Sequence, residues 1–276
     1  MNKPQNIRLV GLDLARAFAI LGMVLVNFKV TMGATESEPQ WLHYLVSLFD
    51  GRAAALFVVL AGIGASLASR RAREAGDSDS KRIARIRLAK RALFLFVLGW
   101  LFFPIWPADI LHFYGAYLAI GAALLFVSNR NLWIIGVSAI TISLVFLVTF
   151  DPFQNWDLNS LAYEGLFTPQ GFIRNLFFDG FHPVFPWIAF YLFGMWLGRT
   201  NLSDKAWRMK LAIRAGSVVL ISEVLAFFAL GLRGSDHSNL DPQSARFLLS
   251  TDPIPPFPLY LMAGAGTAVL IIVLSL

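Results

Sequence analysis

One apolar stretch, from Leu48 to Arg73, most constrains what this chain can fold into. It is long enough to cross a bilayer, because about 20 helical residues rising ~1.5 Å each span the ~30 Å of hydrocarbon. The stretch carries Asp50 and Arg52 at one end and arginines at the other. An ionisable group in hydrocarbon costs roughly 2.5–3.5 kcal/mol on insertion scales, so it normally pairs, faces a wet cavity or serves a function. Asp50 and Arg52 are therefore the first candidate functional residues.

Composition places the whole chain among membrane proteins. Of its 276 residues, 57% are hydrophobic and only 14% are charged, with a mean hydropathy of +0.63, whereas soluble domains carry about 25% charged residues. Apolar runs of membrane-spanning length recur without strand-like alternation, so we predict an all-α polytopic bundle of transmembrane helices. The absence of cysteine excludes disulfides, thiol catalysis and Cys-ligated metal. The net charge of +6 comes from basic residues between spans, so we expect no nucleic-acid partner.

The apolar runs predict about eight spans. They cover residues 12–32, 44–69, 92–106, 110–128, 132–150, 181–198, 211–232 and 257–276. We expect these spans to form a single transmembrane domain over residues 1–276. The chain stops inside an apolar run without flanking charges, so we expect either a C-terminal truncation or a last helix that closes the fold.

The distribution of Lys and Arg orients the predicted spans. Residues 70–91 hold nine basic side chains and residues 199–214 hold five more. The positive-inside rule therefore places both basic loops in the cytoplasm. Alternation of the spans then puts the N-terminus in the cytoplasm and the loop 151–180 on the outer side.

Polar side chains gather at the predicted outer ends of the spans. They comprise all four histidines, His43, His112, His182 and His237, together with Asn27, Asp50, Arg52, Asp109 and Asp179. Helix ends at an interface tolerate polar residues, so simple interfacial placement is the alternative for each position. If the side chains converge instead, they form an outer-facing cavity.

Two pairs of a carboxylate and a histidine stand out by their spacing. His43 and Asp50 are seven residues apart, so they share a helix face if the second span begins early. A carboxylate that orients an imidazole is a general-base arrangement, because histidine titrates near neutral pH. Asp109 and His112 are three residues apart, where Asp109 also suits the start of a helix. The histidines show no metal-ligand spacing such as HExxH, so we expect no metal site.

Four segments occur in a fixed order along the chain. They are RLVGLDLARAFAILGMVLVNF, LFDGRAAALFVVLAGIGASL with RLAKRALFLFVLGW after it, ADILHFYGAYLAIGAALL, and FHPVFPWIAFYLFGMWLGR. Together they resemble the bacterial transmembrane acyltransferase-like proteins related to heparan-alpha-glucosaminide N-acetyltransferase. The resemblance implies an integral enzyme of the bacterial cytoplasmic membrane. Such an enzyme takes an acyl group, typically acetyl, from cytoplasmic acyl-CoA and passes it to a sugar or glycoconjugate on the far side.

The resemblance also implies a catalytic histidine. In the related acetyltransferase the implicated histidine lies between the terminal Asn of the first span and the aspartate that opens the second. His43 corresponds by this order, flanked by Asn27 and Asp50. We predict His43 as general base, Asp50 as the group that orients it, and Asn27 or Arg52 as stabiliser of the oxyanion. Direct transfer and an acetyl-histidine intermediate both stay open.

The remaining predictions concern further candidates, the donor and other functions. His112 and His182 are further catalytic candidates, and we predict that Arg87, Lys90 and Arg91 contact the phosphates of the co-substrate acyl-CoA. Orientation of the chain in the membrane is the alternative role of these basic residues. A transporter or flippase with an outer polar cavity is the alternative function, and a scaffold is a third. The expected partners are the bilayer and the glycoconjugate acceptor, and homo-oligomerisation stays open.

Overall fold

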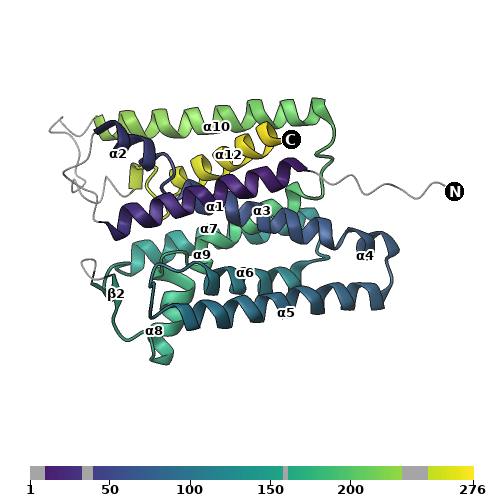
Figure 1. Ribbon diagram of the computed structural model, residues 1–276, viewed down its shortest axis with the longest axis horizontal. Helices are drawn as coiled ribbons and strands as arrows, with labels where there is room; N and C mark the ends of the chain where they lie inside the picture. The colour runs from purple at the N-terminus through teal and green to yellow at the C-terminus, as the bar shows by residue number, and fades with distance from the viewer. Residues whose placement is uncertain (1–9, 33–39, 158–160, 232–247) are drawn as a thin grey trace. The chain divides into compact units, whose positions relative to one another are not determined.

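The computed structural model in Figure 1 is almost entirely helical. It describes residues 10–32, 40–157, 161–231 and 248–276, without the side chains of residues 40, 43, 44, 230 and 231. The chain divides into two compact units. The first comprises residues 1–60, 201–253 and 257–276, and the second comprises residues 61–200 and 254–256. The all-α class predicted from the apolar runs is confirmed, and the single domain stays a prediction.

The first unit consists of long helices and one short helix, α2, which is followed by a turn before α3. Its elements are α1 (Val10–Thr31), α2 (Gln40–Ser47), the start of α3 (Arg52–Ala68), α10 (Lys205–Gly231) and α12 (Pro258–Ser275). Helix α12 packs against both α1 and α10. Gly11 permits the close approach of α1 to α12, because a Cβ at this position would lie 2.6 Å from the carbonyl carbon of Ser275.

Helix α1 has one buried face and several exposed apolar faces. Its buried residues are Leu12, Ala15, Ala19 and Gly22, whose spacing of three and four places them along one face. The other faces carry large apolar side chains, and Leu21, for example, is 60% exposed. Lipid is the solvent that accommodates such a surface, as expected of a span.

The second unit contains most of the remaining elements. They are α4 (Arg70–Ala75), α5 (Ser78–Phe102), α6 (Leu111–Leu124), α7 (Asn129–Thr149), strands β1 (Trp156–Asp157) and β2 (Ala162–Tyr163), α8 (Pro169–Arg174), the π-helix η1 (Asn175–Asp179) and α9 (Val184–Leu197). Helix α5 packs along α6, and α9 packs against α6 and α7. Ten of the 14 residues of α9 are buried, so α9 forms the core of this unit.

The prediction of eight spans is wrong. Among the described residues, five helices are long and apolar enough to cross a bilayer, and a sixth span results if α8 and η1 are counted together with α9. Two predicted spans, 92–106 and 110–128, fall short. The apolar part of α5 begins only at Ala92 and ends with the helix at Phe102, and α6 has 14 residues, which at ~1.5 Å per residue cannot cover ~30 Å.

The basic segments predicted as loops are largely helical. Residues 70–91 form α4 and the first half of α5, and α10 begins within the second basic segment, at Lys205. Alanine, arginine and lysine are good helix formers, so a span can continue as a helix beyond the hydrocarbon. The side of the membrane that these segments face stays a prediction.

Candidate functional site

A polar cavity of about 700 Å³ lies in the first unit, where α1 ends and α3 begins. Lys29, Asp50 and Arg52 line it, together with Trp41, Thr251 and Asp252. Asp50 and Arg52 flank Gly51, whose φ of +65° favours glycine. The Tyr260 hydroxyl donates a hydrogen bond of 3.0 Å to the Gly51 carbonyl and holds this turn in place.

Two ion pairs involve three of the four charged side chains that line this cavity, and the fourth is Asp252. Lys29 Nζ lies 2.5 Å from Asp50 Oδ2, and the guanidinium of Arg52 pairs with Glu223. Glu223 also accepts a hydrogen bond of 3.0 Å from Thr251 Oγ1. The cations of both pairs are about one-fifth exposed. The cavity can therefore offer paired charges to a polar ligand.

A second candidate site in the second unit contains a buried carboxylate and imidazole. Asp109 Oδ2 lies 3.2 Å from His112 Nδ1, and both side chains are at most 5% exposed. The same oxygen accepts hydrogen bonds from the backbone N–H groups of Leu111 and His112, at 2.9 and 3.2 Å. The predicted capping role of Asp109 is thus confirmed, and Asp109 also orients the imidazole. In the tautomer that donates Nδ1–H to the carboxylate, His112 Nε2 carries the lone pair that can accept a proton.

Three ring nitrogens in and around this dyad are buried without a hydrogen-bond partner in the described structure. They belong to Trp100 (Nε1), His112 (Nε2) and His182 (Nδ1). The ring centres of Trp100 and His112 are 5.5 Å apart, and Phe113 lies between the two histidines, with ring centres 3.9 Å from His112 and 6.2 Å from His182. A buried polar atom without a partner costs roughly 1–3 kcal/mol, so these three nitrogens are positions where a water molecule or a polar ligand would be stabilised by a hydrogen bond.

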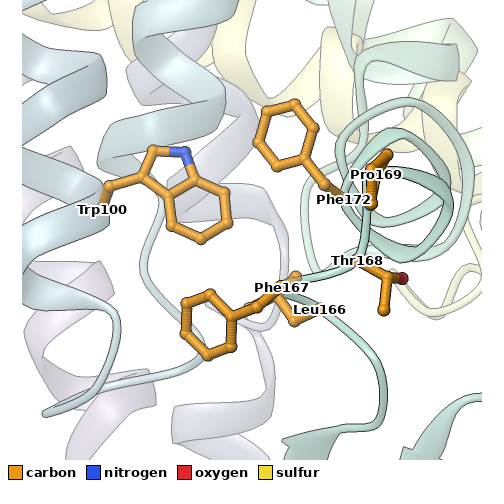
Figure 2. Close-up of a pocket in the computed structure, with 6 residues that line it drawn as sticks. All are labelled: Trp100, Leu166, Phe167, Thr168, Pro169 and Phe172. Atoms are coloured by element: carbon orange, nitrogen blue, oxygen red, sulfur yellow. The ribbon is translucent and has the colours of Figure 1, made fainter.

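An aromatic cavity of about 410 Å³ adjoins Trp100. Figure 2 shows the rings of Trp100, Phe167 and Phe172 around it, with Leu166, Thr168 and Pro169 completing the lining. Trp100 contacts both this cavity and His112, so a ligand held against Trp100 lies close to the dyad.

The close packing of α5 and α6 positions the dyad. A Cβ at Gly99 would lie 2.7 Å from Asp109 Oδ2, and one at Gly115 would lie 2.6 Å from the backbone nitrogen of Phe96. Glycine at both positions therefore lets the start of α6 approach α5. On the other side, the Tyr117 hydroxyl donates to the His182 carbonyl and ties α6 to the segment before α9.

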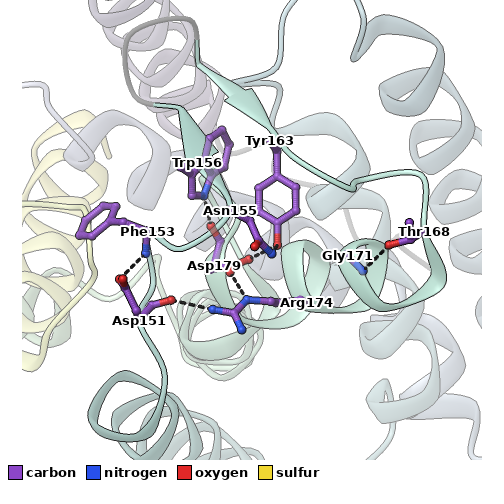
Figure 3. A network of polar contacts seen from close by, with 9 residues as sticks. All are labelled: Asp151, Phe153, Asn155, Trp156, Tyr163, Thr168, Gly171, Arg174 and Asp179. Carbon is purple, nitrogen blue, oxygen red and sulfur yellow. Dashed lines mark hydrogen bonds and ion pairs between the residues drawn. The ribbon is translucent and has the colours of Figure 1, made fainter.

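A polar network holds the segment 151–180 together (Figure 3). Strands β1 and β2 are antiparallel, with Trp156 opposite Tyr163. The Tyr163 hydroxyl donates to Asp179 Oδ1 at 2.8 Å, and Arg174 Nε lies 2.5 Å from Asp179 Oδ2. Burial raises the pKa of Tyr163 above its ordinary value, so the phenol stays protonated and can donate. Arg174 and Asp179 neutralise each other within this network, so we assign the pair a structural role.

Comparison with known protein families shows to which family the chain belongs. The family described as heparan-alpha-glucosaminide N-acetyltransferase, catalytic, matches residues 8–230. The chain belongs to this family. No curated protein and no solved structure matches it.

Membership in the heparan-alpha-glucosaminide N-acetyltransferase family confirms the relation predicted from the four segments. It identifies an integral membrane enzyme of acetyltransferase type. The match covers α1 to α9 and most of α10, so both candidate sites draw on matched residues.

The structure assigns the six predicted catalytic residues of this family member to different units. Asp50 and Arg52 line the polar cavity of the first unit, whereas the Asn27 side chain is exposed on α1. His43 lies in α2, but its side chain is outside the described part of the chain, as is all of His237. His112 and His182 belong to the second unit. Convergence of the six residues stays a prediction.

The condition for a shared face of His43 and Asp50 is not met. Helix α2 ends at Ser47, and Asp50 lies in the turn before α3, where it pairs with Lys29. The pairing of a carboxylate with an imidazole occurs instead between Asp109 and His112. Among the described residues, no group of three or more His, Cys, Asp or Glu could hold a metal ion.

Sequence reasoning missed two partners of the predicted site. Lys29 neutralises Asp50, and Glu223 neutralises Arg52. Glu223 could have been identified from the sequence, because it lies within the apolar run 211–232, where an ionisable residue normally has a partner or a function. The predicted phosphate-binding residues Arg87, Lys90 and Arg91 are exposed on α5.

Proposed function

We propose that this chain transfers an acetyl group from acyl-CoA to a hydroxyl or amine of a sugar or glycoconjugate. The observation that carries the proposal is the buried Asp109–His112 dyad, in which Nδ1 faces the carboxylate and Nε2 is without a partner in the described structure. Family membership supports the acetyltransferase chemistry. The dyad has the arrangement of a general base.

In the proposed reaction His112 Nε2 accepts the proton of the acceptor. The acceptor oxygen or nitrogen forms a bond to the carbonyl carbon of the thioester, and the carbon–sulfur bond breaks. The proton then passes from the imidazolium to the leaving CoA sulfur. Asp109 keeps Nδ1 protonated and stabilises the imidazolium. The aromatic cavity beside Trp100 suits the apolar face of a sugar ring.

The first unit contains the other candidate for the catalytic base, His43. Asp50 and Arg52 line a polar cavity next to the helix that carries His43. His43 remains the catalytic residue implied by the family order, and His112 is the base supported by described contacts. Comparing alanine variants of both residues separates the two assignments.

An assay with labelled donor tests the function. We expect purified protein to transfer label from radiolabelled acetyl-CoA to a membrane glycoconjugate extract, and heat-denatured protein to transfer none. A folded protein that labels no acceptor over a range of extracts would contradict the proposal.

The proposed donor and acceptor sides follow from the orientation of the chain. We propose that residues 70–91 face the cytoplasm of a bacterial cell and that residues 151–180 face outward. Because the native chain has no cysteine, Ser78→Cys and Glu164→Cys each introduce one reactive thiol at an exposed position. In intact cells, a membrane-impermeant maleimide should label Glu164→Cys and leave Ser78→Cys unlabelled until lysis. Labelling of both before lysis would overturn the orientation.

A transporter or flippase is the second candidate function, and one observation favours it. The α8–η1 segment and α9 together form a bent apolar pair with an angle of 49°, as in a broken span or a re-entrant loop. Transporters bind substrate at discontinuous helices. Proteoliposomes that move a labelled glycoconjugate without acyl-CoA, with no acetyl transfer, would support transport over catalysis.

A further inference from the structure

Four basic side chains in the second unit gather at the end of the helices opposite the Asp109–His112 dyad. This basic cluster consists of Arg73, Lys81, Arg85 and Arg199. Three of its members surround the turn between α6 and α7. Arg199 donates to the carbonyls of Leu125 and Val127, at 3.1 and 2.6 Å. Lys81 Nζ and Arg85 Cζ lie 6.0 and 5.3 Å from the centre of the Phe126 ring.

The fourth member, Arg73, is placed by the part of α3 that belongs to the second unit, residues 61–68, which packs against α9. The Ser66 hydroxyl donates to the Met195 carbonyl at 2.6 Å, and a Cβ at Gly198 would lie 2.9 Å from Ile63 Cα. The two helices therefore end side by side, and Arg73 follows one of them while Arg199 follows the other. Burial, and then the positive charge of Arg73, lower the pKa of Arg199 to about 10.

The charges of the basic cluster are not compensated by an acidic side chain. No ion pair within the described residues includes Arg73, Lys81, Arg85 or Arg199. Of the nearby carboxylates, Glu74 pairs with Arg70, and Asp77 caps the start of α5. Burial lowers the pKa of Arg73, and the negative charge of Glu74, which raises it, has the smaller effect.

The guanidinium groups of Arg73 and Arg199 also keep donors without partners. The Nε atom of each is buried and has no hydrogen-bond partner in the described structure. Two half-buried guanidinium groups beside each other repel unless an anion lies between them. Phosphate oxygens match the planar donor fork of arginine, and lysine binds phosphate as a point charge.

We propose that the basic cluster binds the phosphate group of a ligand. Two ligands carry such a phosphate group. One is an anionic phospholipid, through its headgroup, and the other is CoA, whose binding rests on the proposed function. The site differs from the one predicted from the sequence, since Arg87, Lys90 and Arg91 all lie on α5, whereas the cluster combines side chains from α4, from α5 and from the residues after α9.

Binding measurements on the whole protein in nanodiscs test the proposal and separate the sources. The first arm titrates CoA into nanodiscs of neutral phosphatidylcholine, and the second measures the rise in Tm when phosphatidylglycerol replaces part of that lipid. We expect Arg73→Gln to weaken CoA binding roughly tenfold or to abolish the lipid-dependent rise. Arg71→Gln, exposed in the same helix, is the matched control and should change neither.

Further variants keep the test independent of folding and of acetyl transfer. Arg199→Gln also removes a cap of α6, so the double variant Lys81→Gln/Arg85→Gln, which loses no backbone hydrogen bond of α6, serves as the second test. Loss in the CoA arm identifies the donor as the source, and loss in the lipid arm identifies the phospholipid. Unchanged CoA affinity together with an unchanged lipid effect in these variants overturns the site. Lipid binding without any acetyl transfer would contradict the proposed function alone.

Discussion

Replacing His112 by alanine is expected to reduce acetyl transfer by about 10²–10⁴-fold while the protein stays inserted and folded. The factor is the usual contribution of a positioned general base. His112 Nε2 has no partner in the described structure, so the substitution removes only the contact of Nδ1 with Asp109, whose Oδ2 keeps the hydrogen bonds from the backbone N–H groups of residues 111 and 112. Turnover of labelled acetyl-CoA, measured at matched amounts of folded protein, gives the result.

Asp109→Asn is the companion variant. Asparagine caps a helix about as well as aspartate, so α6 should keep its start, while the imidazolium loses its carboxylate. We expect a loss of roughly 10²-fold or more. Asp77→Asn is the matched control, because Asp77 caps α5 through Ser80 in the same way and is exposed. It should leave transfer unchanged.

The variant His43→Ala decides between the two assignments. If it abolishes transfer and His112→Ala does not, the family order identifies the base correctly and the dyad is structural. If only His112→Ala abolishes transfer, the base lies in the second unit. Loss in both variants means that each histidine serves the reaction.

Replacing Arg174 by methionine is expected to lower stability by about 3–5 kcal/mol, because it leaves a buried carboxylate without its partner. The Asp179 side chain is fully buried, and Arg174 is 18% exposed. Arg174 also donates to the Asp151 carbonyl at 2.6 Å (Figure 3), and its guanidinium lies 5.3 Å from the centre of the Phe178 ring. Such a loss corresponds to a Tm lower by on the order of 10 °C, measured by thermal unfolding in detergent.

Two further variants identify the cause of that loss. Asp179→Asn in the Arg174→Met background removes the buried charge and should restore most of the Tm. Arg130→Met is the control, since Arg130 is exposed near the start of α7. An Arg174→Met protein with unchanged Tm would mean that water or another cation compensates Asp179.

The amino-acid sequence alone determined the class of this protein. Apolar runs longer than about 18 residues have few other solutions than a membrane helix, so six of the eight predicted spans correspond to elements that can cross a bilayer, when α8, η1 and α9 are counted as one span. The order of the four segments also identified the family, which the match over residues 8–230 confirms. Both signals are local or ordered along the chain, and neither depends on which helices meet.

Only the tertiary structure decided the span count and the partners of the charges. A periodicity argument could not see that the helical basic segment leaves α5 too short an apolar part to span. Lys29 meets Asp50 across 21 residues, and Glu223 meets Arg52 across 171. The Asp109–His112 contact is local, but its burial depends on the close packing at Gly99, which aligns α5 and α6. Spacing can suggest that two polar groups share a helix face, but packing determines which of them are buried, paired or left with a free nitrogen.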